Sequence, residues 1–92
     1  MLAPEQESAF IEAVNVELEK AEAKHGTWPT DAVHASAILN EEAGKLTQAS
    51  IDFTCGHIPP DKAHGRMAEM CLRVAAMSMR YWESLHEYTK AN

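Results

Sequence analysis

Two short breaks divide the chain into three long segments in which apolar residues recur every three or four positions. The first break, residues 25–31, contains a glycine and a proline, and the second, residues 55–61, contains a glycine and two consecutive prolines. Glycine and proline are disfavoured inside helices, whereas this apolar spacing is typical of amphipathic helices. No segment alternates apolar and polar residues as a β-strand does. The chain is therefore predicted to be one all-α domain over residues 1–92, a bundle of three main helices.

Signals at the ends of these segments set the expected helix boundaries. A proline followed by acidic residues opens residues 4–24, as is typical of a first helical turn. Thr30 or Asp31 can cap the second helix, which is expected to end near residue 54. The third helix is predicted to begin near Asp61 and to be the longest.

The third helix carries an apolar stripe from Met67 to Tyr88 that includes Cys71 and is expected to form core. Arg66, Arg73 and Arg80 recur every seven residues and therefore lie along one edge of that stripe. A row of arginines requires acids or phosphates opposite it. A chain of 92 residues is too short to cover such a stripe alone. The bundle is therefore predicted to be completed in a homo-oligomer, a dimer or a tetramer.

One carboxylate interrupts the apolar stripe of the second helix. Glu42 falls in the middle of the stripe formed by Ala35, Ile38, Leu39, Leu46, Ala49 and Phe53. An unpaired buried charge is so unfavourable that this carboxylate must find a cation, a metal or a proton. We expect the cation to be Arg73, with Lys45 as the alternative. The sequence thus predicts a site around Glu42.

The composition excludes several kinds of partner. The formal charge is −6, with 8 Lys and Arg against 14 Asp and Glu, so the field of the protein repels a nucleic-acid polymer. No apolar run approaches about 18 residues, and acids stand where a signal peptide needs bases. The two cysteines lack a CxxC spacing, which fits a reducing compartment. The predictions are no nucleic-acid polymer, no membrane and a cytoplasmic location.

Three stretches together resemble the MazG-like, all-α nucleoside triphosphate pyrophosphohydrolase superfamily. They are the loop Gly-Thr-Trp-Pro at residues 26–29, the helical segment at 34–46 and the segment at 73–80, and the resemblance covers roughly residues 26–85. Members carry a Glu-Glu-x-x-Glu motif on one helix and a Glu-x-x-Asp motif on the next. The resemblance implies Mg²⁺-dependent hydrolysis of a nucleoside triphosphate to a monophosphate and pyrophosphate, because Mg²⁺ prefers hard oxygen ligands and bridges substrate phosphates.

The metal-binding motifs are incomplete in this chain. Glu41 and Glu42 fit the first two glutamates and are the implied catalytic residues, but the third position holds Lys45 and the aspartate of the second motif falls on Arg73. Besides a wrong alignment of the helices with these motifs, two interpretations stay open. In one, Lys45 and Arg73 neutralise Glu42 in a metal-free charge cluster. In the other, Glu41, Glu42 and Glu69 form a displaced Mg²⁺ site.

The predicted substrate-binding residues are Trp28, His34, Lys45 and Arg73. Trp28 can stack on a base, although a loop tryptophan can also cap the core. The predicted function is a MazG-like relative that binds a nucleoside triphosphate, with weak or lost hydrolysis. The alternative is a non-catalytic oligomeric interaction or structural protein that keeps the MazG-like fold.

Overall fold

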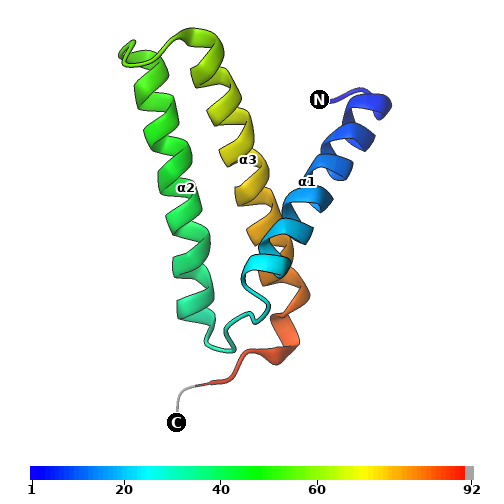
Figure 1. Ribbon diagram of the computed structural model, residues 1–92. Coiled ribbons are helices and arrows are strands. Elements are labelled where there is room, and N and C mark those ends of the chain that lie inside the picture. Colours follow the sequence, from blue (N-terminus) through cyan, green and yellow to red (C-terminus); the bar gives the residue numbers. More distant parts are fainter. Residues whose placement is uncertain (91–92) are drawn as a thin grey trace.

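The computed structural model describes residues 1–90 and contains no β-strand among them. Figure 1 shows its elements in order: α1 (Pro4–Lys24), α2 (Ala32–Thr54), α3 (Pro60–Glu83) and a short 3-10 helix, η1 (Leu85–Glu87). The all-α prediction is confirmed, the predicted helix starts are correct to within a residue or so, and α3 is the longest helix. No helix within residues 1–90 is both long and apolar enough to cross a membrane.

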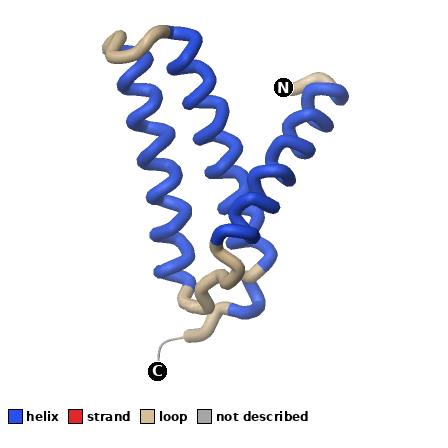
Figure 2. The backbone as a smooth tube through the Cα atoms, in the orientation of Figure 1, coloured by secondary structure: helices blue, strands red, loops and turns tan. Residues whose placement is uncertain are grey.

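The second and third helices form an antiparallel hairpin, and α3 also packs against α1. Figure 1 shows α1 diverging from this hairpin toward its N-terminal end. The loop between α1 and α2 and the segment after η1 lie at the same end of the molecule, as Figure 2 shows. There the backbone N–H of Thr89 donates to the carbonyl of Thr30 at 3.0 Å. The space between α1 and α2 is thus bounded by α3 along its length and by the 25–31 loop at one end.

The helix starts follow from local chemistry. Pro4 opens α1, and the side chain of Gln6 accepts a hydrogen bond from the backbone N–H of Ala3 at 2.9 Å. Asp31, rather than Thr30, caps α2, because its carboxylate accepts from the backbone N–H of Val33 at 2.9 Å. These contacts satisfy N–H groups that have no partner inside a helix. The sequence signals at the helix starts were therefore reliable.

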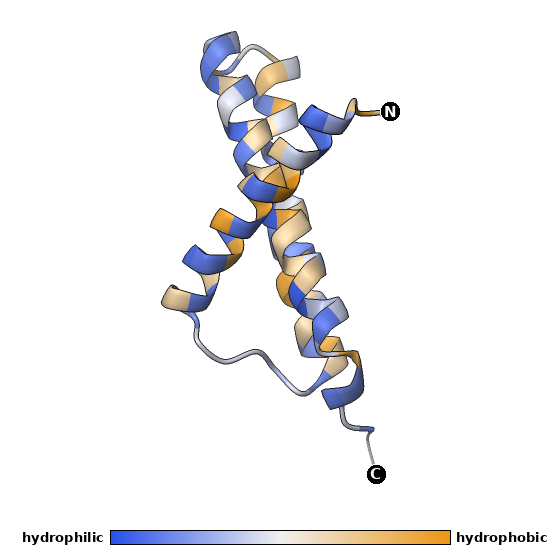
Figure 3. Cartoon of the chain, turned by 90° about the vertical axis from the view of Figure 1, so that its right-hand side faces the viewer, coloured by the Kyte–Doolittle hydropathy of each residue, from blue (hydrophilic) through white to orange (hydrophobic). Residues whose placement is uncertain are grey.

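The core is thin and small residues contribute much of it. Val14 of α1 packs with Ala76 and Met77 of α3, and none of the large side chains in residues 1–90 is completely buried. Four alanines are fully buried on the hairpin helices: Ala35 and Ala49 on α2, and Ala63 and Ala76 on α3. Figure 3 shows the hydrophobic residues gathered where α1 crosses the hairpin. Beyond that crossing, the N-terminal half of α1 has little cover.

Two sequence-based expectations about the third helix are wrong. The third helix ends at Glu83, so its apolar stripe does not continue to Tyr88 on one helix. Instead Tyr88 folds back, and its hydroxyl donates to the carbonyl of Tyr81 at 3.2 Å. In a continuing helix, Tyr88 would lie about 10 Å beyond Tyr81 along the helix axis. Cys71, expected in the core, is exposed.

Candidate functional site

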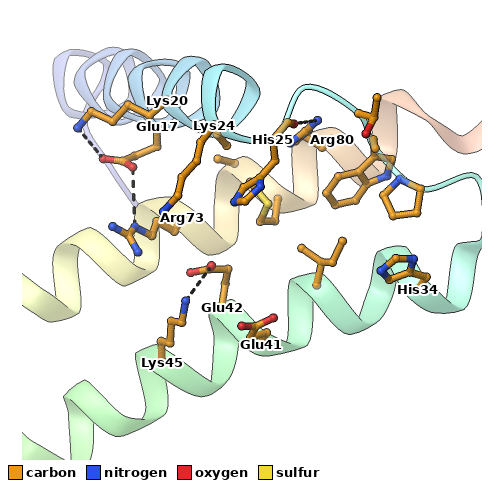
Figure 4. A pocket seen from close by; sticks show the side chains of 17 residues that line it. Glu17, Lys20, Lys24, His25, His34, Glu41, Glu42, Lys45, Arg73 and Arg80 are labelled. Atoms are coloured by element: carbon orange, nitrogen blue, oxygen red, sulfur yellow. Dashed lines mark hydrogen bonds and ion pairs between the residues drawn. The ribbon is translucent and has the colours of Figure 1, made fainter.

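A cleft of about 820 Å³ lies between the three helices and the 25–31 loop. Figure 4 shows side chains from α1, α2 and α3 directed into it, with the residues of the loop at one end. Its volume lies within the range of small-molecule binding sites. Most of the residues that were predicted to form a site line this cleft: Trp28, His34, Glu41, Glu42, Lys45 and Arg73. Glu69 does not line it.

The charge of the cleft is opposite to that of the whole chain. Five of the 8 Lys and Arg residues line it, namely Lys20, Lys24, Lys45, Arg73 and Arg80. Only three of the 14 acidic residues do so, namely Glu17, Glu41 and Glu42. A concave site with walls of one prevailing charge concentrates its electrostatic potential. The cleft therefore attracts anions although the protein is acidic.

At one end of the cleft, which we call the paired end, cations and carboxylates meet. Arg73 donates from Nη2 to Oε1 of Glu69 at 2.8 Å, and its Nε lies 4.0 Å from Oε2 of Glu17. The other oxygen of Glu17 lies 3.4 Å from Nζ of Lys20. Figure 4 shows Glu17 between Lys20 and Arg73. Each of these cations thus already has a carboxylate.

Glu42 lies at the same end with only one of its oxygens paired. Its Oε1 lies 3.4 Å from Nζ of Lys45. Its Oε2 is buried, and within residues 1–90 it is the one such side-chain atom without a hydrogen-bond partner. The prediction that Arg73 neutralises Glu42 is wrong, because Glu17 from α1 and Glu69 from one turn earlier on α3 occupy Arg73. Lys45, the alternative, is the observed partner because it lies one turn after Glu42 on α2.

At the other end, which we call the tryptophan end, a cation is held without a carboxylate. The guanidinium carbon of Arg80 lies 4.8 Å from the ring centre of Trp28. Arg80 also donates from Nη2 to the carbonyl of His25 at 3.2 Å, as drawn in Figure 4. The indole N–H of Trp28 in turn donates to the hydroxyl of Tyr88 at 2.8 Å. These contacts fix both Trp28 and Arg80.

Sequence reasoning did not assign Arg80 to the site. Its seven-residue spacing from Arg73 was the available signal, since that spacing places both arginines on one side of α3. Trp28 packs against the core cluster, so its core-capping role is confirmed, and it also lines the cleft. Stacking of Trp28 on a base stays a prediction.

The acidic residues of the cleft do not suit a magnesium ion. Within residues 1–90, no three His, Cys, Asp or Glu side chains are grouped closely enough to hold a metal. Glu69 forms an ion pair with Arg73 outside the cleft, and Lys45 faces Glu42. These cations repel a divalent ion. The structure thus holds Glu69 apart from Glu41 and Glu42, and the displaced Mg²⁺ site on these three residues stays a prediction.

Comparisons of the chain with protein-family models, with curated proteins and with solved structures found no match. The residues of the cleft are therefore the basis for assigning a function.

Proposed function

We propose that the cleft binds a nucleoside phosphate, as in a MazG-like protein in which fixed cations replace Mg²⁺ and pyrophosphohydrolase activity is weak or lost. The observation that carries this proposal is the excess of cations in the cleft of an acidic protein. Lysine and arginine are the side chains that bind phosphate oxygens most strongly. The cleft volume of about 820 Å³ is also sufficient for a nucleotide.

The loss of hydrolysis follows from the surroundings of the two implied catalytic residues. Glu41 and Glu42 both line the cleft, but Glu42 pairs with Lys45 rather than with other carboxylates. Hydrolysis of this class depends on a metal that polarises the phosphate and activates water. Without a group of carboxylates to hold that metal, binding is favoured over turnover. Pyrophosphate release at a rate typical of enzymes, abolished by Glu42→Gln, would contradict this part of the proposal.

Calorimetric titration with a nucleoside triphosphate, in chelator and then in Mg²⁺, tests the binding. We expect binding in chelator, and affinity that is equal or lower in Mg²⁺, because Mg²⁺ reduces the negative charge offered to the cleft. Lys45→Glu should weaken binding severalfold, because it reverses one of the charges that make the cleft attractive to anions. Lys62→Glu makes the same charge change outside the cleft and serves as the control. Binding that requires Mg²⁺, or no binding, would overturn the proposal.

An oligomeric interaction or structural protein is the second candidate, supported by the uncovered apolar residues of α1. Phe10 and Ile11 continue the stripe that contains Val14, but they are exposed because α1 diverges from α3. A second copy of the chain offers partners for the glutamates of α1, since the first half of α3 carries Lys62 and Arg66, although Asp61 and Glu69 lie on the same half. Ion pairs of those glutamates with Lys62 and Arg66 would favour association of two copies.

Light scattering at micromolar concentration tests this candidate. We expect a dimer or tetramer mass that Phe10→Ser with Ile11→Ser lowers to that of the monomer, since these residues would lose apolar contact area. Val33→Ser removes an exposed apolar side chain at the start of α2 and should leave the mass unchanged. A monomer mass for the unmodified protein would exclude this candidate.

A further inference from the structure

We infer that Arg80 is the residue that anchors the phosphate group of the ligand, at the tryptophan end of the cleft. That the ligand is a nucleotide rests on the proposed function. That the ligand carries an anionic group rests on the surroundings of Arg80 alone. It specifies where the phosphate lies: beside Trp28 and the C-terminal end of α1, and away from the carboxylates of the paired end.

The first argument is that Arg80 is buried without a counter-ion. Arg80 is 7% exposed, and within residues 1–90 no carboxylate lies within ion-pair distance of it. A guanidinium group stays charged in proteins, so it cannot avoid the desolvation penalty by losing a proton. That penalty amounts to several kcal/mol for a buried ion. An anion bound beside Arg80 would remove it.

The contacts that Arg80 does make compensate for only part of this penalty. A cation over a tryptophan ring contributes about 2 kcal/mol when it is desolvated. The hydrogen bond to the carbonyl of His25 adds a similar amount and lies at the negative end of the α1 dipole. These contacts hold the guanidinium in one place. They therefore preorganise it for an anion without neutralising it.

The second argument is that the remaining donors of Arg80 are open to the cleft. Arg80 lines the cleft, and its one observed hydrogen bond within residues 1–90 uses Nη2. In the same part of the chain, Oε2 of Glu42 is the one buried side-chain atom that is both inaccessible to solvent and without a hydrogen-bond partner. The other two nitrogens of Arg80, Nε and Nη1, also lack a partner within residues 1–90, so they must retain some access to solvent although the residue is buried. They can donate to an oxygen-rich group inside the cleft.

A second cation without a carboxylate lines the same cleft. Lys24, at the end of α1, also lines the cleft, and within residues 1–90 it forms no ion pair with a carboxylate. Lys20, Lys45 and Arg73 differ, because carboxylates already accompany them. An anion that binds at Arg80 therefore displaces no existing ion pair. A phosphate monoester presents several oxygens to the planar fork of Arg80.

The test is thermal denaturation in inorganic phosphate, with chloride at equal ionic strength as the baseline. Phosphate should raise the Tm of the unmodified protein, because a ligand that binds only the folded state stabilises it. Arg80→Met fills similar space and should raise the phosphate concentration needed for this effect by about tenfold or more. Arg66→Met removes an exposed arginine from the same helix and should keep the full response. Arg80→Lys keeps the charge but not the planar fork, and should respond in between.

The baseline Tm separates binding from a structural role. Because Arg80 has no carboxylate, Arg80→Met should leave the Tm in chloride unchanged or higher. A lower Tm with an undiminished phosphate response would mean that Arg80 is structural, and the inference would be overturned. An equal phosphate response in Arg80→Met and Arg66→Met would overturn it too. Should Arg80→Met fail to fold, Arg80→Lys decides: a response equal to that of the unmodified protein contradicts the inference.

Calorimetry with a nucleotide distinguishes this inference from the proposed function. If the nucleotide binds Arg80→Met as tightly as the unmodified protein, the proposed function stands and the assignment of Arg80 fails. If phosphate stabilises the protein through Arg80 but no nucleotide binds, the assignment stands and the proposed function fails. Nucleotide binding that weakens about tenfold in Arg80→Met and not in Arg66→Met supports both.

Discussion

Arg73 and Arg80 stand seven residues apart on one helix and line the same cleft, yet their surroundings are opposite. The side chain of Arg73 is 38% exposed and has carboxylates on either side, Glu17 and Glu69. Arg80 as a residue is 7% exposed and has an indole ring and a backbone carbonyl instead. The difference arises because α1 still offers a glutamate at the level of Arg73 but has ended at the level of Arg80.

This difference has a consequence for binding. At the paired end, a ligand anion must compete with the carboxylates that already accompany Arg73. Because this arginine is partly exposed, an ion pair between it and the ligand contributes only about 0 to 1 kcal/mol to binding. At the tryptophan end, an anion meets Arg80 without a competitor. Burial also strengthens electrostatic interactions, because the local dielectric is lower. The two ends of one cleft are therefore expected to differ in anion affinity.

The largest expected effect comes from removing the support of the tryptophan end. Trp28→Ala should lower the free energy of unfolding by about 3 kcal/mol, since it removes core contacts, the contact with Arg80 and the hydrogen bond to Tyr88. Urea denaturation measures this change. Trp82, which is 73% exposed, provides the control, and Trp82→Ala should cost about 0.5 kcal/mol or less. Equal losses for the two tryptophans would mean that Trp28 does not support this end of the cleft.

A smaller effect, of opposite sign, is expected at the paired end. Glu42→Met should raise the free energy of unfolding by about 1 kcal/mol, because it removes a buried oxygen that has no hydrogen-bond partner. Glu41→Met, at the exposed neighbouring position, should change stability by about 0.5 kcal/mol or less. Both can be measured in one set of urea titrations. A clear loss of stability in Glu42→Met would show that its second oxygen has a partner in solution.

Double-mutant cycles test which cation accompanies Glu42. The coupling free energy between Glu42 and Lys45 should be about 0.5 kcal/mol, as for other partly exposed pairs on one helix. The coupling between Glu42 and Arg73 should be smaller, because Arg73 is paired elsewhere. Glu42→Gln, Lys45→Met, Arg73→Met and the two double mutants suffice for both cycles. A coupling above about 2 kcal/mol for Glu42 with Arg73 would reverse this assignment.

The smallest effect is expected outside the cleft, near the end of α2. A hydrogen bond to His57, whose Nδ1 lies 3.1 Å from Oδ1 of Asp52, is the main cause that lowers the pKa of Asp52 below 3.8. A carboxyl group whose pKa is lowered by folding stabilises the fold at pH values above its ordinary pKa. This contribution is lost as the pH falls below 3.8 and through the pKa of the folded state. Asp52→Asn should therefore be slightly less stable than the unmodified protein at pH 6 and equal to it in strong acid. A difference that persists in strong acid would have another cause.

Much of the fold could be predicted because its signals are local. Pro4, Asp31 and Pro60 mark the helix starts, and their effects depend on residues within one turn. The periodicity of apolar residues likewise depends only on helix geometry, so three helices followed directly from it. Glu42 was recognised as unusual for the same reason, since its place in an apolar stripe is visible without any tertiary contact.

The sequence by itself thus determined the helices, the cations that the chain has available and the awkward position of Glu42. The tertiary structure decided which charges meet. Glu17 reaches Arg73 because α1 crosses α3 at that level, and Arg80 lacks a carboxylate because α1 ends there. Tyr88 meets Trp28 because α3 stops at Glu83 and the chain turns back. Residues this far apart in sequence are brought together by the angle between packed helices, which no local pattern of residues specifies.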